Sequence, residues 1–284
     1  MDWQHSFDSM HGEMSLLGMV IPFVKASACG NDFLLVDAAP IEDDLASADM
    51  AGLTQRMCNR HEGVGADGVE WMYPHPAADV EIRLINADGS EAEISGNGTR
   101  CVAAYICAER GQEKVAIQTG AGLKTCVLTE RSESEYEFEA EMGQAVVGAE
   151  LALKLGANEV RGIPVSMGNP HYVVFVPQFA EDWRTTAAEI QRRPQFTHGV
   201  NVEMVLLEGK HDMKVRFFER GVGETQSSGT GSCAAAVAAM ATGRAESPVR
   251  VHTPGGTQTV RQERKTVFLR GAARLVCRGE FFLS

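Results

Sequence analysis

Two alanine-rich segments, residues 97–110 and 231–243, constrain the fold of this chain more than any other feature. Both are nearly uncharged along their first turns, and a helix that is apolar on every face has to be buried on every face. Each follows a Ser-Gly-X-Gly sequence, which begins at Ser95 in one case and at Ser228 in the other, about half the chain apart. We therefore expect an internal duplication in which each half wraps several strands around one buried helix.

Most of the remaining chain is strand-like. Short runs rich in Val, Ile and Phe, bounded by Gly, Asp or Asn, predict strands at 20–26, 34–37, 80–85, 115–119, 124–128, 136–142, 162–167, 172–176, 200–206, 214–219, 249–252, 266–269 and 273–277. Amphipathic spacing predicts two further helices, at 48–59 and 181–190. We place the boundary between the halves at 140–150, where an acidic run gives way to Gly143. The alternative is one continuous domain with two similar helices.

Charge and cysteine content narrow the class of protein. The net charge of −12 disfavours binding to nucleic acid or to an anionic membrane. No apolar run is long enough to span a bilayer, and the first 20 residues lack the basic start of a signal peptide. An odd number of cysteines, seven, is typical of reduced thiols in the cytoplasm, and their spacing gives no set of four zinc ligands. We expect a cytoplasmic protein without a metal.

The two Ser-Gly-X-Gly loops are candidate anion sites. A helix start presents unpaired N–H groups and the positive end of the helix dipole, and small residues let a ligand approach the backbone. Two such starts facing each other across a cleft would hold one carboxylate between them. The alternative is that Ser95 and Ser228 are simply N-caps, because serine is among the best capping residues.

Further polar motifs stand beside turn residues at the ends of predicted strands. Amide, imidazole and charged side chains occur at Asn31, Asn86, Asn169, His171, Asn201, Glu219 and Arg220. A single Asn at such a place can simply close a turn. Together these groups can bind an amino acid, because amides accept from an ammonium group and a guanidinium donates to a carboxylate. The sequence Gly63–Gly68 matches G-x-G-x-x-G but follows a helical pattern, so cofactor-free chemistry is the simplest interpretation.

At these motifs the sequence resembles the diaminopimelate epimerases, a family of cofactor-independent amino-acid racemases and epimerases. The resemblance runs from about Pro22 to Leu283 and rests on several motifs in the family's order, namely Gly30–Phe33, Arg60–Gly68, Asn86–Ser90, Gly168–His171, Asn201 and Glu219–Gly231. It implies an α+β fold of two pseudo-symmetric domains, each a curved, mostly antiparallel, barrel-like sheet around a central helix. The implied domains are 21–140 together with 274–284, and 141–273, preceded by an extension over 1–20.

The resemblance also implies a reaction, which is the interconversion of LL- and meso-diaminopimelate by removal and return of a proton at an α-carbon. A small-molecule amino acid would be the substrate, no cofactor would take part, and the assembly would be a homodimer. The reacting carboxylate would be bound by Gly96, Asn97, Gly229 and Thr230. The amino group and distal carboxylate would be held by Asn31, Asn86, Asn169, Asn201, Glu219 and Arg220. His171 and Glu219 would stand next to the two bases.

The chain departs from the family at the bases themselves. The family has a cysteine at each loop-leading position, one acting as thiolate base and the other as thiol acid, whereas this chain has Ser95 and Ser228. A thiol of pKa ~8.5 is a few per cent ionised at pH 7, and a helix start lowers that pKa further. A hydroxyl with a pKa near 15.7 is ionised at about one part in 10⁸ to 10⁹. The nearby Cys101 and Cys233 lie past the first helical turns, where packed, apolar thiols are expected.

Three interpretations of the two serines remain open. The chain is an epimerase whose cysteines were replaced by design, or a natural relative that works on another substrate, or a protein that binds an amino acid without chemistry. In the second case His171 or Glu219 would be the single base, Ser95 and Ser228 would donate hydrogen bonds, and the reaction would be a double-bond isomerisation or a dehydration.

Overall fold

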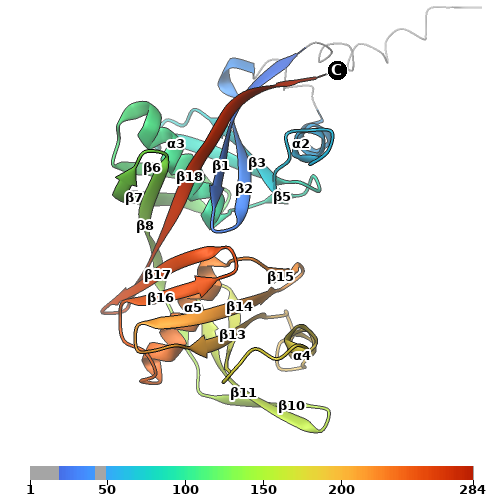
Figure 1. Ribbon diagram of the computed structural model, residues 1–284, viewed down its shortest axis with the longest axis vertical. Coiled ribbons are helices and arrows are strands. Elements are labelled where there is room, and N and C mark those ends of the chain that lie inside the picture. The colour runs from blue at the N-terminus through green and yellow to red at the C-terminus, as the bar shows by residue number, and fades with distance from the viewer. Residues whose placement is uncertain (1–18, 42–48, 284) are drawn as a thin grey trace, which may run out of the picture. The chain divides into compact units, whose positions relative to one another are not determined.

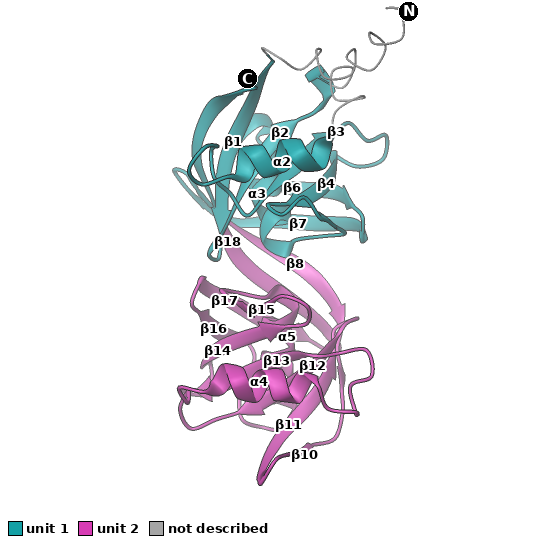
Figure 2. Cartoon of the chain, turned by 90° about the vertical axis from the view of Figure 1, so that its right-hand side faces the viewer, with its two compact units in different colours: residues 1–136, 273–284 teal, residues 137–272 magenta. Residues whose placement is uncertain are grey.

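The computed structural model describes residues 19–41 and 49–283 (Figure 1). The extension expected over residues 1–20 lies outside the described residues, apart from its last two positions. The chain divides into two compact units, residues 1–136 with 273–284 and residues 137–272 (Figure 2). The α+β fold class is confirmed, since both units combine helices with strands that pair mainly antiparallel.

Unit 1 is a set of strands with a long helix packed against them. Its elements are β1 (Val20–Ala28), β2 (Asn31–Asp37), η1 (Ala39–Ile41), α2 (Met50–Cys58), β3 (Gly68–Tyr73), β4 (Val80–Asn86), β5 (Glu91–Ala92), α3 (Gly96–Arg110), β6 (Lys114–Thr119) and β7 (Gly122–Ser132). Strands β1 and β2 pair antiparallel, β2 and β3 parallel, β3 and β4 antiparallel, β4 and β6 parallel, and β6 and β7 antiparallel.

Unit 2 repeats this order. Its elements are β9 (Val146–Val147), β10 (Leu151–Leu155), β11 (Asn158–Ser166), β12 (Pro170–Phe175), α4 (Trp183–Gln191), β13 (Asn201–Leu207), β14 (Asp212–Glu219), β15 (Gly223–Thr225), α5 (Gly229–Ala241), β16 (Val249–Thr253) and β17 (Gly256–Glu263). From β11 to β17 the pairings again alternate between antiparallel and parallel, in the same sequence as from β1 to β7. The internal duplication expected from the two alanine-rich helices is therefore present in the strand pairing.

Two strands contribute residues to both units. Strand β8 (Glu135–Gln144) begins in unit 1 and continues into unit 2, and β18 (Thr266–Phe282) begins in unit 2 and ends in unit 1. In unit 2 the start of β18 pairs with β17, and in unit 1 its end pairs with β1. The last strand of the chain thus completes the sheet of the first unit (Figure 1).

The central helices are buried as the sequence indicated. In α5 every residue from Gly231 to Ala239 is buried, and valines from the surrounding strands pack against its alanines. In α3 the buried run extends from Asn97 to Ala104. The two amphipathic helices are α2 and α4, which bury one face each against the strands of their own unit. No helix in the described ranges has the length and apolar character needed to cross a membrane.

Several strands were not predicted from the sequence. The structure adds β3, β5, β9, β10, β15 and β17, and it joins the predicted strands 266–269 and 273–277 into the single strand β18. Strand β3 was missed because its apolar run is interrupted by Glu70, which is nevertheless fully buried. The segment Gly63–Gly68 connects α2 to β3, so a helix precedes it and a strand follows it, the reverse of a dinucleotide-binding turn.

Candidate active site

The start of α3 is capped by Ser95. Its backbone is extended, and its Oγ accepts a hydrogen bond from the N–H of Gly98 at 3.1 Å. The Ser95 carbonyl accepts from the N–H of Thr99 at 2.8 Å. These bonds use N–H groups of the first turn that a helix leaves without internal partners. The N–H groups at the very start of the helix, beginning with Gly96, are those a ligand can reach.

The start of α5 has the same construction. Ser228 is extended, its Oγ accepts from the N–H of Gly231 at 3.2 Å, and its carbonyl accepts from the N–H of Ser232 at 2.9 Å. Both serines are therefore N-caps, and both leave the first N–H groups of a helix of more than ten residues directed outward. Capping and anion binding are compatible, because the cap occupies the third and fourth N–H groups of the turn.

An asparagine is fixed to the second residue of each helix. In unit 1, Asn97 donates from Nδ2 to Oδ1 of Asn31 at 2.8 Å. In unit 2, Asn169 donates from Nδ2 to Oγ1 of Thr230 at 3.3 Å. In both units an Asn at or directly before the start of a strand, β2 or β12, thus contacts the second residue of the central helix, although the helix residue is the donor in unit 1 and the acceptor in unit 2. We call the residues around the start of α3 the first half-site, and those around the start of α5 the second half-site.

The first half-site is held by charged neighbours. Asn31 donates to Asp67 at 3.0 Å, and Arg60 forms a bidentate ion pair with Asp32 and a further bond to Asp67. Asn86 lies at the end of β4 and donates to the Ser90 hydroxyl at 3.1 Å, which closes the turn into β5.

Arg100 was not singled out in the sequence. Its guanidinium donates to the Gly96 carbonyl at 3.2 Å and to Oδ1 of Asn97 at 2.5 Å, while the side chain is almost fully buried. Arg100 thereby holds the Asn97 side chain so that the Nδ2 group of Asn97 is directed toward Asn31. Its position four residues after Gly96, on the same face of the helix, was the available signal.

The second half-site contains a buried imidazole–carboxylate pair. His171 Nδ1 lies 2.7 Å from Oε1 of Glu203, and its Nε2 lies 3.0 Å from Oδ1 of Asn169. The side chains of His171 and Glu203 are almost fully inaccessible to solvent. Burial raises the pKa of Glu203, and the contact with His171 opposes that rise. Because both ring nitrogens are engaged, His171 orients the Asn169 amide and presents no free nitrogen.

The remaining predicted residues lie at the ends of β13 and β14. Oδ1 of Asn201 accepts from the Arg220 N–H at 2.9 Å, and its Nδ2 donates to the Pro170 carbonyl at 3.2 Å. The Arg220 guanidinium donates to the His198 carbonyl at 2.7 Å. Glu219 is the last residue of β14 and is partly exposed. The structure therefore brings Asn201, Glu219 and Arg220 together at one end of the β13–β14 pair.

Glu70 and Glu203 were missed from the sequence. Each stands inside an apolar strand, in the similar sequences Val69–Met72 and Val202–Val205, and each is buried to 1% exposure or less. The repetition of Val-Glu followed by two apolar residues, once per half, was the signal that could have identified them. Cys101 and Cys233 are fully buried, and burial raises the pKa of both thiols, that of Cys233 to about 12. The expected packed role of both thiols is confirmed.

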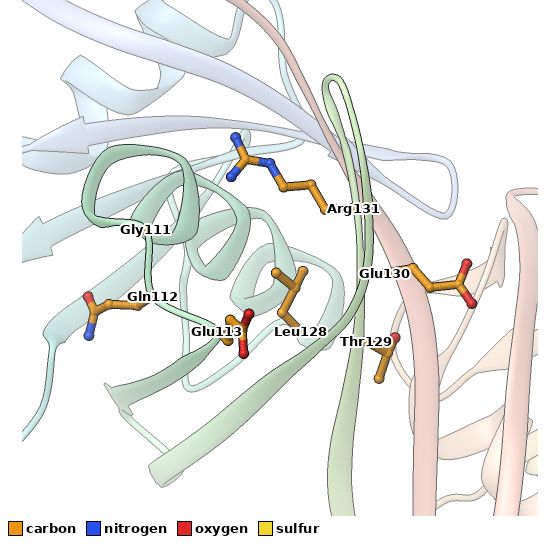
Figure 3. Close-up of a pocket in the computed structure, with 7 residues that line it drawn as sticks. All are labelled: Gly111, Gln112, Glu113, Leu128, Thr129, Glu130 and Arg131. Carbon is orange, nitrogen blue, oxygen red and sulfur yellow. The ribbon is translucent and has the colours of Figure 1, made fainter.

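Two pockets of unit 1 lie away from these residues. One of about 370 Å³ follows the C-terminal end of α3 and is lined by charged side chains of Glu113, Glu130 and Arg131 (Figure 3). The other, of about 620 Å³, lies along β1 and the end of β18. Neither contains a predicted site residue. Across the described residues, no three His, Cys, Asp or Glu side chains are grouped so that they could hold a metal ion.

Solved structures share this fold. A hydroxyproline epimerase from Agrobacterium vitis is 17% identical, with a TM-score of 0.64, and the match covers 93% of this chain and 92% of that one. A methylitaconate-delta-isomerase is 15% identical, with a TM-score of 0.67 and coverage of 94% and 96%. These likenesses show that the chain shares the fold of both proteins.

Sequence relatives define the family. The profile of the family described as diaminopimelate epimerase matches residues 23–147 and 163–276. Proteins named diaminopimelate epimerase from Pelotomaculum thermopropionicum and Microcystis aeruginosa are 37% and 36% identical. Those matches cover 91% and 92% of this chain and 98% and 99% of the relatives. The chain belongs to the diaminopimelate epimerase family.

Proposed function

We propose that this chain interconverts LL- and meso-diaminopimelate, removing a proton from one α-carbon and returning it on the opposite face. Membership of the family supports the substrate. The observation that carries the proposal is the repeated half-site. In each, a serine caps the start of the central helix, and the side chain of the second helical residue is hydrogen-bonded to an Asn side chain from a strand end. A single carboxylate shared by both helix starts would be stabilised as charge develops on the α-carbon.

The substrate contacts follow from the half-sites. We assign the reacting carboxylate to the helix starts at Gly96–Asn97 and Gly229–Thr230. The other polar groups of the substrate are assigned to the amides and charged side chains at Asn31, Asn86, Asn169, Asn201, Glu219 and Arg220. A guanidinium suits the distal carboxylate because it donates in a planar fork.

Ser95 and Ser228 stand in this proposal on opposite faces of the α-carbon, where the family has cysteines. Their hydroxyls are poor bases on their own, so each needs a group that accepts its proton. The buried ring of His171, with both nitrogens in hydrogen-bond contact, supports a role for this residue in positioning the Asn169 amide. We place the reaction in the cytoplasm, and the odd number of cysteines, seven, supports a reducing compartment.

The test is solvent deuterium exchange. The full chain is incubated with LL-diaminopimelate in D₂O, and loss of the α-proton signal is followed by NMR beside a Ser95→Cys/Ser228→Cys variant. The proposal predicts exchange by the wild-type chain and faster exchange by the variant, because thiols restore bases with a pKa near 8.5. Absence of exchange by the wild-type chain would overturn it, and exchange by the variant alone would leave only the substrate assignment standing.

A further inference from the structure

Glu70 is a buried carboxyl group without a partner. It lies on β3 with 0% exposure, and within the described part of the chain neither of its side-chain oxygens has a hydrogen-bond partner. Burial of an unpaired polar group is costly, and proteins rarely retain one without a use for it.

The carboxyl lies against the first turn of α3. A methyl group added to Gly98 would be 1.9 Å from Oε1 of Glu70 and 3.3 Å from Cβ of Ser95. Glu70 and Ser95 thus approach the same point of the turn, and Ser95 Oγ is itself bonded to the Gly98 N–H. A direct hydrogen bond from the Ser95 hydroxyl to the Glu70 carboxyl would have to form in the substrate complex, where catalytic hydrogen bonds commonly tighten.

The second unit shows what an ordinary buried glutamate at this place looks like. Glu203 occupies the same position, since a methyl group on Gly231 would be 2.8 Å from its Oε1. The strand partner of Glu203 is Val173, two residues after His171, and the strand partner of Glu70 is Leu35, two residues after Phe33. Phe33 therefore occupies in unit 1 the position that His171 occupies in unit 2. Glu203 is bonded to His171, whereas Phe33 cannot pair with Glu70. Glu70 therefore has no structural ion pair.

The groups around Glu70 leave its proton available. The flanking strands place Leu35 and Leu84 opposite it, and both are buried and apolar. From α3, the Arg100 guanidinium is bonded to Asn97 and to the Gly96 carbonyl, and the Cys101 thiol stays protonated because burial raises its pKa. Desolvation alone raises the pKa of Glu70 to about 8.

We propose that Glu70 is the proton acceptor and donor for Ser95, and that it acts through the serine and not on the substrate. This inference rests on the proposed function. In the forward step the substrate C–H bond and the Ser95 O–H bond break. The α-proton moves to Ser95 Oγ, the former hydroxyl proton moves to Glu70, and the electron pair remains on the α-carbon beside the carboxylate. The reverse step returns the proton, so Ser95 is a hydroxyl before and after each transfer.

The acid–base character of Glu70 suits this role. A base works best when its pKa lies near the working pH, and a carboxyl near pKa 8 accepts and returns a proton more evenly than an exposed one. Its sealed position prevents exchange of that proton with bulk water during a turnover.

The test compares Glu70→Gln in two backgrounds, using α-proton exchange of LL-diaminopimelate in D₂O. With Ser95 present, Glu70→Gln should lower exchange by about 100-fold or more, the usual size of a general-base contribution. With Ser95→Cys, the thiol is its own base, so Glu70→Gln should change exchange only a few-fold. The wild-type rate should rise with pH through an inflection near 8, and Glu70→Gln should remove that inflection.

Each outcome decides between roles. Equal losses in both backgrounds would show that Glu70 is merely structural, and no loss in either would show that it is unused, so both results overturn the inference. No exchange by the wild-type chain, with exchange by Ser95→Cys/Ser228→Cys, would overturn the relay and leave the family's substrate in place. If neither of those proteins exchanges the proton, the substrate assignment fails as well. Thermal melting of every variant separates loss of folding from loss of chemistry.

Discussion

Replacing Glu70 should change how the stability of the protein depends on pH. Burial raises the pKa of this carboxyl from 4.5 to about 8 in the folded chain. Between these values the unfolded chain has released its proton while the folded chain still holds it. The free energy of unfolding therefore falls as pH rises through this window, and the contribution of the protonated group is complete only below pH 4.5.

The magnitude follows from linkage. One proton held by the folded state alone changes the folding equilibrium about tenfold per pH unit, and over this window the total is roughly 4–5 kcal/mol. Glu70→Gln keeps the shape of the side chain and removes the titration. We expect the variant to be similar to wild type near pH 4.5 and more stable by several kcal/mol at pH 8.

Urea unfolding followed by circular dichroism at pH 5, 6, 7 and 8 measures this difference. Glu62→Gln is the matched control, because it removes an exposed carboxyl from the same unit. Its unfolding curves should remain parallel to wild type. A constant offset between Glu70→Gln and wild type across these pH values would refute the assignment of a buried, protonated Glu70.

Other changes test the half-sites separately. Gly98→Ala should lower stability by about 1–3 kcal/mol in urea unfolding, because a methyl group would meet Glu70 at 1.9 Å. Gly96→Ala, with nothing within 4 Å of the added methyl, should fold normally and lose diaminopimelate binding in calorimetry. His171→Phe should cost about 3–5 kcal/mol and more as pH rises, because it strands a Glu203 whose pKa burial already raises. Arg220→Ala should weaken binding at least tenfold, the loss of one charged hydrogen-bonded contact, and unchanged affinity in calorimetry would remove it from the site.

The helices and the duplication could be predicted because their signals are local. The alanine-rich runs, the serine caps and the glycines after them act within one helical turn, so the sequence around Ser95 and Ser228 carries the information. The four Asn residues of the polar motifs stand at or beside strand ends as expected, because turn residues near an Asn are also a local signal.

The contacts between distant segments could not be predicted. Glu203 meets His171 because β12 and β13 pair in parallel, and Asn97 meets Asn31 because α3 packs against β1 and β2. No spacing in the sequence encodes either contact. Strand β3 could not be predicted either, because the charged Glu70 interrupts the apolar run by which a buried strand is identified. The burial of Glu70 becomes intelligible only when the glycine of the overlying helix turn is seen to make room for it.

A crystal structure of the full chain with diaminopimelate bound tests most directly whether both helix starts serve one substrate. We expect one carboxylate of the ligand to lie about 3 Å from a backbone nitrogen at Gly96 or Asn97 and, at the same time, from one at Gly229 or Thr230. The Ser95 and Ser228 hydroxyls should face the same α-carbon from opposite sides. A ligand carboxylate bound to only one helix start, or to neither, would contradict the shared site.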